Sequence, residues 1–305
     1  SLSEKPIEGL FSNRLSIAPQ SQNNQPQFIS TQLIPIKGFD ANVRIKSGIH
    51  VKGANLDLVS PKGQNSKIDF IINSKAFISL EAEKFSMINR KFYAKNVFFL
   101  LYLLDDTISH PSIDLTFNLE TKKMHAATSK NQLGRSPFYD GLHQLQIVAN
   151  HLYWEQEKDV LIFQNNQSSR LEPVVYQSLR FFDPNWFIDL FSSEDTHPTT
   201  PLWRLYRKRK KAPFFYVQEI QAAYKHKSIA DTKKLLTDFT NQGFVHYNKF
   251  EEKVKINRRF ITFVTGLNND TDFDKIRFKS LITNRPSGKI DMKTGELIVN
   301  AVKEV

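Results

Sequence analysis

The sequence predicts an α+β protein that is mainly β, in which meandering or stacked antiparallel, solenoid-like strands carry a winged-helix-like helical insert. Three observations indicate this fold class. Strand-length runs with alternating apolar and polar residues follow one another from residue 39 to about residue 164. A helix start, an apolar helical face and a glycine stop lie between Ser228 and Gly243. Strand-like runs return after residue 257.

Composition limits the classes of function that are open to the chain. Its 305 residues allow one large or two modest domains, and 40% hydrophobic residues are enough for a packed core. Lys and Arg outnumber Asp and Glu by 42 to 31, which suits an anionic partner such as nucleic acid, lipid headgroups or acidic glycans. The absence of cysteine excludes disulfides, zinc–thiolate sites and thiol nucleophiles, so a metal would need His and carboxylate ligands.

The first segment, residues 1–38, is predicted to be an extended arm or linker. It is rich in Ser, Gln, Asn and Pro, and residues 20–27 have no apolar periodicity that could be buried. A surface loop and an arm that adds to a partner both fit this composition. The chain starts at Ser1 without a leader, so we expect it to be processed, trimmed or part of something longer.

The second segment, residues 39–178, is predicted to be a β-rich domain. The strand-like runs span residues 39–45, 48–59, 67–73, 76–88, 90–104, 112–120, 122–128, 143–154 and 159–164. The run 143–154 also fits a helix, because Leu145, Val148, Ala149 and Leu152 recur at helical spacing. The longest apolar run, residues 97–104, is much shorter than the roughly 18 residues that suggest a membrane span.

The third segment, residues 179–257, is predicted to be a helical, winged-helix-like region. Residues 201–211 form a first helix that opens at Pro201, and a second helix places Val217, Ile220 and Tyr224 on one face. Two short strands at 244–247 and 254–256 then form the wing. Three helices followed by a hairpin are in the order of a winged helix.

The third helix of this region has the clearest local signals. Ser228 is its predicted N-cap, and Gly243 ends it in a left-handed conformation. Its expected buried face contains four residues, namely Ile229, Leu235, Leu236 and Phe239. Residues 258–305 are predicted to return as strands to the β region, at 258–264, 274–282, 288–292 and 295–302, and to end on a strand that pairs or continues elsewhere.

Two resemblances extend this interpretation. Residues 92–101, FYAKNVFFLL, resemble the strand rhythm of envelope lipid-bridge proteins, the jelly-roll grooves that carry lipopolysaccharide and the related inner-membrane-anchored groove proteins. That resemblance implies a continuous apolar lining built from Val97, Phe99 and Leu101. The Lys-, Asn-, Ile- and Phe-rich, cysteine-free sequence is also similar to the large uncharacterised β-rich envelope proteins of Bacteroidota, which implies a segment of a long structural protein at the cell envelope or secreted.

A basic cluster in the first helix is the candidate anion-binding site. It consists of Arg204, Arg207, Lys208, Arg209, Lys210 and Lys211, interleaved with Trp203 and Tyr206. Such cations neutralise phosphates, and the aromatic rings stack on bases or lie at a lipid interface. The alternative is a solvated helix face whose aromatic residues belong to the core.

The surface that a winged helix uses to read DNA has little net charge in this sequence. Asp231 and Asp238 offset Lys233 and Lys234 on the third helix. Acidic and basic residues also alternate in the wing, where Glu251 and Glu252 lie among lysines. Because a reading helix meets the negative charge of a groove, the sequence favours structural use or protein contact over DNA binding.

The sequence contains no catalytic signature. The glycine-rich nucleotide motifs and the GxSxG motif are absent, and the eight histidines are scattered, although His143 and His151 share a face if their segment is helical. We therefore expect that the protein is not an enzyme and that it binds neither a metal ion nor a cofactor. The leading hypothesis is a non-catalytic structural or interaction segment of a larger envelope-associated or secreted β-rich protein, in contact with other chains or further segments of the same protein. The alternatives are a nucleic-acid-binding winged-helix protein and a lipid-carrying β-groove protein.

Overall fold

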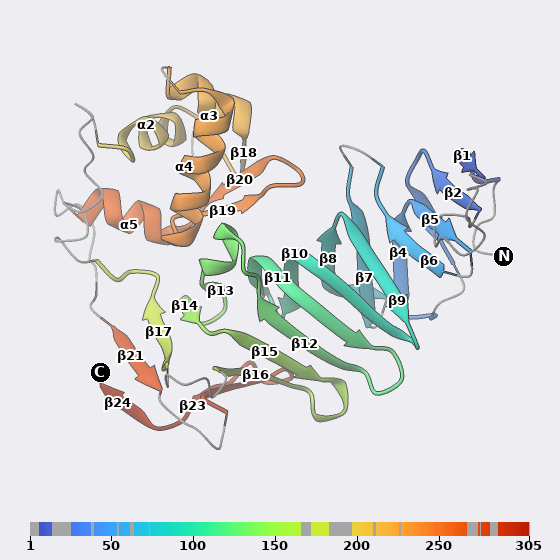
Figure 1. Ribbon diagram of the computed structural model, residues 1–305. Helices are drawn as coiled ribbons and strands as arrows, with labels where there is room; N and C mark the ends of the chain where they lie inside the picture. Colours follow the sequence, from blue (N-terminus) through green and yellow to red (C-terminus); the bar gives the residue numbers. More distant parts are fainter. Residues whose placement is uncertain are drawn as a thin grey trace.

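The computed structural model describes residues 6–13, 26–37, 40–53, 55–61, 64–72, 74–165, 172–182, 197–209, 212–225, 227–266, 274, 276–280 and 286–304. These residues form an α+β structure that is mainly β, in which a large antiparallel sheet carries a helical unit at one side (Figure 1). The predicted fold class is therefore confirmed.

The sheet is one network of 21 strands that divides into two layers. Layer A contains, in spatial order, β1 (Gly9–Ser12), β2 (Gln27–Ser30), β5 (Ile49–Lys52), β6 (Asn55–Val59), β9 (Lys84–Ile88), β10 (Lys91–Leu103), β11 (Asp106–Asn118), β12 (Lys123–Thr128), β15 (His151–Glu155), β16 (Val160–Gln164), β22 (Gly288–Asp291) and β23 (Leu297–Val299). Layer B contains β3 (Ile34–Ile36), β4 (Val43–Ser47), β7 (Ser66–Ile72), β8 (Lys75–Ala82), β10, β11, β13 (Phe138–Asp140), β14 (Leu145–Val148), β17 (Val174–Ser178), β21 (Arg277–Ser280) and β24 (Val302–Glu304).

The long hairpin β10–β11 belongs to both layers. Residues 91–94 of β10 pair with β9 in layer A, whereas residues 98–101 pair with β8 in layer B. The register shifts between Ala94 and Val97, and Asn96 adopts a φ of 57° there, which marks a β-bulge that bends the strand. Pro111 lies in the middle of β11 and has no N–H for a ladder bond. The bulge and the proline thus lie where the hairpin passes from one layer to the other.

A continuous apolar core fills the space between the layers. Aromatic pairs connect the two inner faces, because Phe70 of β7 lies 4.2 Å from Phe117 of β11 and Phe138 of β13 lies 5.6 Å from Phe163 of β16, measured between ring centroids. All four rings are buried. In strands such as β4, β15 and β17, alternate residues enter this core, which is the reason for the period of two in the sequence.

The helical unit has the chain order of a winged helix. Its elements are α2 (Thr200–Lys208), β18 (Phe215–Tyr216), α3 (Val217–Ala223), α4 (Ile229–Asn241), β19 (Val245–Asn248), β20 (Lys253–Ile256) and α5 (Arg258–Gly266). The three strands form a separate small sheet in the order β18, β20, β19. Two short 3-10 turns, η1 (Gln132–Arg135) and η2 (Gln156–Lys158), belong to the β part of the chain.

The capping signals of α4 are confirmed. The Ser228 hydroxyl accepts a hydrogen bond from the Asp231 N–H at 3.1 Å, and the Asp231 carboxylate accepts one from the Ser228 N–H. Gly243 follows the helix with a φ of 71°, a value that L side chains rarely adopt. Local chemistry therefore fixes both ends of this helix.

The buried face of α4 differs in part from the prediction. Leu236 and Phe239 are buried against Val217, Ile220 and Tyr224 of the second helix, whose common face is confirmed. Leu235 is only partly buried, and Ile229 is 43% exposed in the first turn of the helix. The buried stripe runs at i, i+4 and i+7 through Thr232, Leu236 and Phe239. The predicted buried face is therefore rotated slightly about the helix axis from the observed one.

Residues 258–264 were predicted to form a strand, and this prediction is wrong because they lie in helix α5. Phe260 and Phe263 are fully buried in the core of the helical unit, and Gly266 is buried one turn further on. A spacing of three residues between buried positions is helical. The many β-branched and aromatic residues of this segment favoured a strand locally, but packing against α4 determines the outcome.

Three other segments also differ from expectation. Strands β1, β2 and β3 lie in the segment that was predicted to be an arm, although most of residues 20–27 lie outside the described part of the chain. Residues 143–154, which fitted a strand or a helix, contain strands β14 and β15. The charged tail after Val299 contains β24, which pairs with β21.

The helical unit is docked on the outer face of layer B. The His246 ring of β19 lies 4.9 Å from the Phe98 ring of β10, and Asn248 donates a hydrogen bond to Glu81 of β8. The Gln146 side-chain amide of β14 donates to the Gly243 carbonyl at 3.1 Å. The end of α4 and the first wing strand are thus held against the β part of the protein.

Candidate binding surfaces

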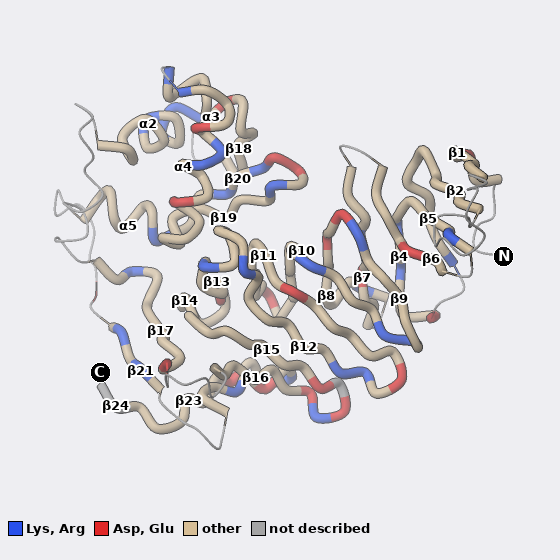
Figure 2. Tube along the Cα trace, in the orientation of Figure 1, with Lys and Arg blue, Asp and Glu red and all other residues tan. Residues whose placement is uncertain are grey.

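Helix α2 presents part of the predicted basic cluster to solvent. Arg204, Arg207 and Lys208 are exposed, and none of them has an ion pair within the described part of the chain. The Arg209 guanidinium donates a hydrogen bond to the Glu219 carboxylate of α3. Lys210 and Lys211 lie outside the described residues. Figure 2 shows the blue colour of Lys and Arg on the described part of α2.

The two aromatic residues of the cluster have a different environment. Trp203 and Tyr206 are half-buried, their rings stack at 5.9 Å, and both pack against the apolar core of the helical unit together with Leu205. Leu202 is fully buried and anchors the helix. The cations therefore form the outer face of α2, whereas the aromatic side chains lie mostly toward the core.

The surface that winged helices use for DNA is partly covered in this protein. The Asn241 side chain at the end of α4 accepts a hydrogen bond from the Ser136 hydroxyl, and β19 lies against layer B. Lys233 of α4 forms an ion pair with Glu252 at the tip of the wing, and Lys253 forms one with Glu251 at 3.0 Å. Both signs of charge meet at the hairpin tip (Figure 2). The surface is thus partly covered, and its acidic and basic residues nearly balance, so it has little of the positive charge that a DNA groove attracts.

The residues expected to line a lipid groove lie in the core between the layers. Val97, Phe99 and Leu101 are all fully buried and belong to the continuous apolar core. Neighbouring side chains, such as the rings of Phe70 and Phe117, which lie in contact at a tilted angle, fill the space that they face. These three side chains consequently present no open apolar surface to an acyl chain.

The outer face of layer A carries a register row that sequence reasoning missed. Directly opposed residues on successive strands run in the order Leu10, Ile29, His50, Asp57, Ser86, Tyr93, Thr116, His125, Tyr153, Ile162, Lys289 and Ile298. The central residues are polar or aromatic, and both ends of the row are apolar. No signal in the sequence alone gives the register that aligns these strands.

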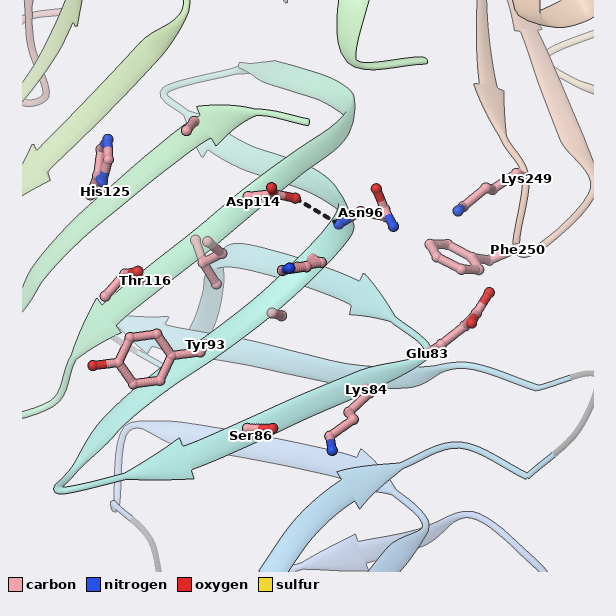
Figure 3. Close-up of a pocket in the computed structure, with 14 residues that line it drawn as sticks. Glu83, Lys84, Ser86, Tyr93, Asn96, Asp114, Thr116, His125, Lys249 and Phe250 are labelled. Atoms are coloured by element: carbon pink, nitrogen blue, oxygen red, sulfur yellow. Dashed lines mark hydrogen bonds between the residues drawn. The ribbon is translucent and has the colours of Figure 1, made fainter. Parts of the chain in front are cut away.

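A pocket of about 570 Å³ lies where the hairpin tip of the helical unit approaches this face (Figure 3). Its floor includes Ser86, Tyr93 and Thr116 from the middle of the register row, and its wall includes Lys249 and Phe250 from the hairpin tip. Figure 3 shows Lys249 and Phe250 extending from the hairpin toward the floor strands. Volumes of about 300–1,000 Å³ are typical of small-ligand sites.

The β-bulge of β10 shapes one end of the pocket. The Asp114 carboxylate accepts hydrogen bonds from the Asn96 N–H at 3.1 Å and from the Ser129 hydroxyl at 2.7 Å. The Asn96 side-chain carbonyl accepts a hydrogen bond from the Asn131 amide at 2.7 Å. This network fixes the exposed side chain of Asn96 at the pocket, and among the described residues no acceptor takes a hydrogen bond from its side-chain amide N–H groups.

A pair of histidines continues the floor of the pocket. His125 Nε2 lies 2.9 Å from His151 Nδ1, and Tyr153 stacks on His125 at 4.5 Å. Burial lowers the pKa of both histidines, which favours their neutral forms. The expected partner His143 lies elsewhere, 2.7 Å from Asp140, because the segment that contains His151 is a strand and not a helix.

Two further findings concern metal ligands and helix length. Within the described ranges, no three His, Asp or Glu side chains gather in a way that could hold a metal ion. None of the described helices is both long and apolar enough to cross a bilayer.

Comparisons of the chain with protein-family models, with curated proteins and with solved structures found no match.

Proposed function

We propose that the chain is a non-catalytic structural and interaction unit that joins further β segments through its open strand edges. This proposal rests on the unpaired strand edges at the two ends of the layers. Among the described residues, β1 and β3 each pair on one side only, and so do β23 and β24. The first and last strands lie at opposite ends of the molecule (Figure 1).

Both ends expose apolar side chains next to these edges. Leu10 and Phe11 of β1 are 70% and 68% exposed, and Ile298 of β23 and Val302 of β24 are 48% and 42% exposed. An edge strand offers unpaired N–H and C=O groups to an incoming strand. Because the two ends differ from each other, such contacts are head-to-tail and extend the sheet in one direction. The partner we infer is a β segment of like design, for which a second copy of this chain is the available probe.

Sedimentation velocity over a wide range of protein concentration tests this proposal. The unaltered chain should associate as concentration rises, and Leu10→Lys, Phe11→Lys or Ile298→Lys should weaken the association because a lysine at an edge opposes strand addition. Ile88→Lys is the matched control, since Ile88 is 59% exposed but lies away from both ends of the row. A monomer at every concentration, or equal weakening by Ile88→Lys, would refute the proposal.

A second candidate function, anion binding by α2, is favoured by the exposed Arg204, Arg207 and Lys208. Fluorescence anisotropy with single-stranded and duplex DNA at 50 and 200 mM salt tests it. Contacts of several cations with phosphates should lose roughly tenfold or more in affinity between the two salt concentrations. Replacement of all three cations by alanine should abolish the binding. An absence of binding at low salt would exclude this function.

A further inference from the structure

The pocket between the hairpin tip and layer A has features that strand-edge association does not use. It lies on the face of a sheet, several strands away from either open edge, so it cannot accept an added strand. Two aromatic rings, Tyr93 from the floor and Phe250 from the wall, line it together with hydroxyl and amide groups. Tyr93 is 38% exposed.

The pocket is lined by the carboxylates of Glu83 and Asp114, of which Asp114 already accepts two hydrogen bonds, and also by cations without carboxylate partners. Lys249 is half-buried, and its Nζ lies 4.6 Å from the centroid of the Phe250 ring. Lys95 is exposed on β10 at the bulge. In the part of the chain that the structure describes, no carboxylate lies within 4.0 Å of either ammonium group, whereas Lys84 at the rim is paired with Asp57 at 2.6 Å.

The half-burial of Lys249 has an energetic consequence. Loss of hydration lowers its pKa, with Glu83 acting weakly in the opposite direction. A desolvated ammonium gains most from a charged acceptor that comes with its own ligand, because such hydrogen bonds are stronger than neutral ones. The pocket therefore favours an anionic group placed near Lys249, Lys95 and the Asn96 amide.

We propose that this pocket binds an acidic oligosaccharide, with its carboxylate or sulfate between Lys95 and Lys249 and its sugar rings against Tyr93 and Phe250. The apolar faces of sugar rings pack on aromatic side chains, and their hydroxyls exchange hydrogen bonds with Ser86, Thr116 and Asn96. An acidic peptide would meet the same cations, but the floor offers no open ladder for its backbone.

Isothermal titration calorimetry of the full chain with short polyuronate oligomers tests this proposal. A neutral oligosaccharide of the same length and a short poly-glutamate peptide are the comparison ligands. We expect the polyuronate to bind at least tenfold more tightly than either, since charge-assisted hydrogen bonds and ring contacts add together. Sulfated oligomers in a further arm distinguish a sulfate from a carboxylate as the preferred anion.

The variants separate binding in this pocket from the general effect of removing an exposed lysine. Lys249→Gln and Lys95→Gln should each weaken polyuronate binding about tenfold, and Tyr93→Leu should weaken the sugar ligands but not the peptide. Lys75→Gln at the start of β8 is the matched control, because Lys75 is exposed and does not line the pocket, and it should leave the affinity unchanged. Amide hydrogen exchange should show protection by the ligand in residues 84–96 and 248–251. Equal loss with Lys75→Gln, equal binding of poly-glutamate, or no binding of polyuronate would each overturn the proposal.

Discussion

Protonation of His110 should destabilise the protein in weak acid. This histidine lies in β11 and is fully buried. Its Nδ1 accepts a hydrogen bond from the Ser112 N–H at 3.1 Å, so its Nε2 carries the proton and donates to the Ser136 carbonyl at 2.7 Å. A second proton on Nδ1 would face the Ser112 N–H without an acceptor. The folded structure therefore holds one neutral tautomer of His110.

The size of the effect follows from the pKa of His110 in the two states. Burial lowers the pKa in the folded protein to about 4, against about 6.5 in the unfolded chain. Between these two pKa values the unfolded state binds more protons than the folded state. Neutral His110 therefore makes its full contribution to the free energy of unfolding above about pH 6.5, and this contribution is lost as the pH falls. The loss is about 2 kcal/mol at pH 5 and about 3 kcal/mol below pH 4.

Urea unfolding of the unaltered chain and of His110→Gln between pH 7.5 and pH 5 measures this contribution. The variant should be less stable at pH 7.5, because one of the two buried hydrogen bonds is lost. On acidification to pH 5, its free energy of unfolding should fall by about 2 kcal/mol less than that of the unaltered chain. His143→Gln is the control of opposite sign. The hydrogen bond to Asp140 raises the pKa of His143, so protonated His143 stabilises the folded state in acid. Its removal should therefore increase the free energy of unfolding that is lost on acidification. Parallel pH profiles for His110→Gln and the unaltered chain would refute the assignment.

Two further predictions concern the helical unit, and urea unfolding at neutral pH measures both. Leu236→Ala and Phe239→Ala should each cost roughly 2–5 kcal/mol through lost burial and a residual cavity. Lys234→Ala, on the exposed face of the same helix, should cost within about 0.5 kcal/mol, and equal costs for the three would contradict the helix phase. Gly243→Ala should destabilise by more than about 1 kcal/mol, because its φ is 71° and a Cβ there would overlap the Gln146 amide; an unchanged free energy of unfolding would show that this helix end is not constrained.

Helices α2, α3 and α4 of the helical unit could be predicted from the sequence because their signals are local, whereas α5 could not. Ser228 and Asp231 form their capping box within one turn, and Gly243 terminates α4 by its own conformation. The apolar spacing of Val217, Ile220 and Tyr224 indicates a buried helical face without knowledge of the partner. Such features depend on residues close together in the chain, so the sequence contains them directly.

The β part could be predicted only as a class. Alternation shows that a run is a strand, but it does not say which strand lies beside it, and a shift by one residue reverses the exposed face. His125 and His151 meet because β12 and β15 are neighbours, and Tyr93 faces Thr116 because of the register of β10 and β11. The pocket additionally needs Lys249, more than 100 residues away from the floor strands. These contacts are long-range, which explains why the candidate site escaped sequence reasoning.

The position of the helical unit links the two surfaces of the protein. Its hairpin β19–β20 holds layer B through His246 and Asn248, and the tip of the same hairpin supplies the wall of the pocket on layer A. His110 donates to the Ser136 carbonyl, and the Ser136 hydroxyl donates to Asn241 of α4, so a chain of hydrogen bonds connects the β11 interior to the helical unit. Because the wall and the floor come from different parts of the chain, the shape of the pocket depends on this contact. Substitutions that loosen it should therefore weaken ligand binding without touching the pocket.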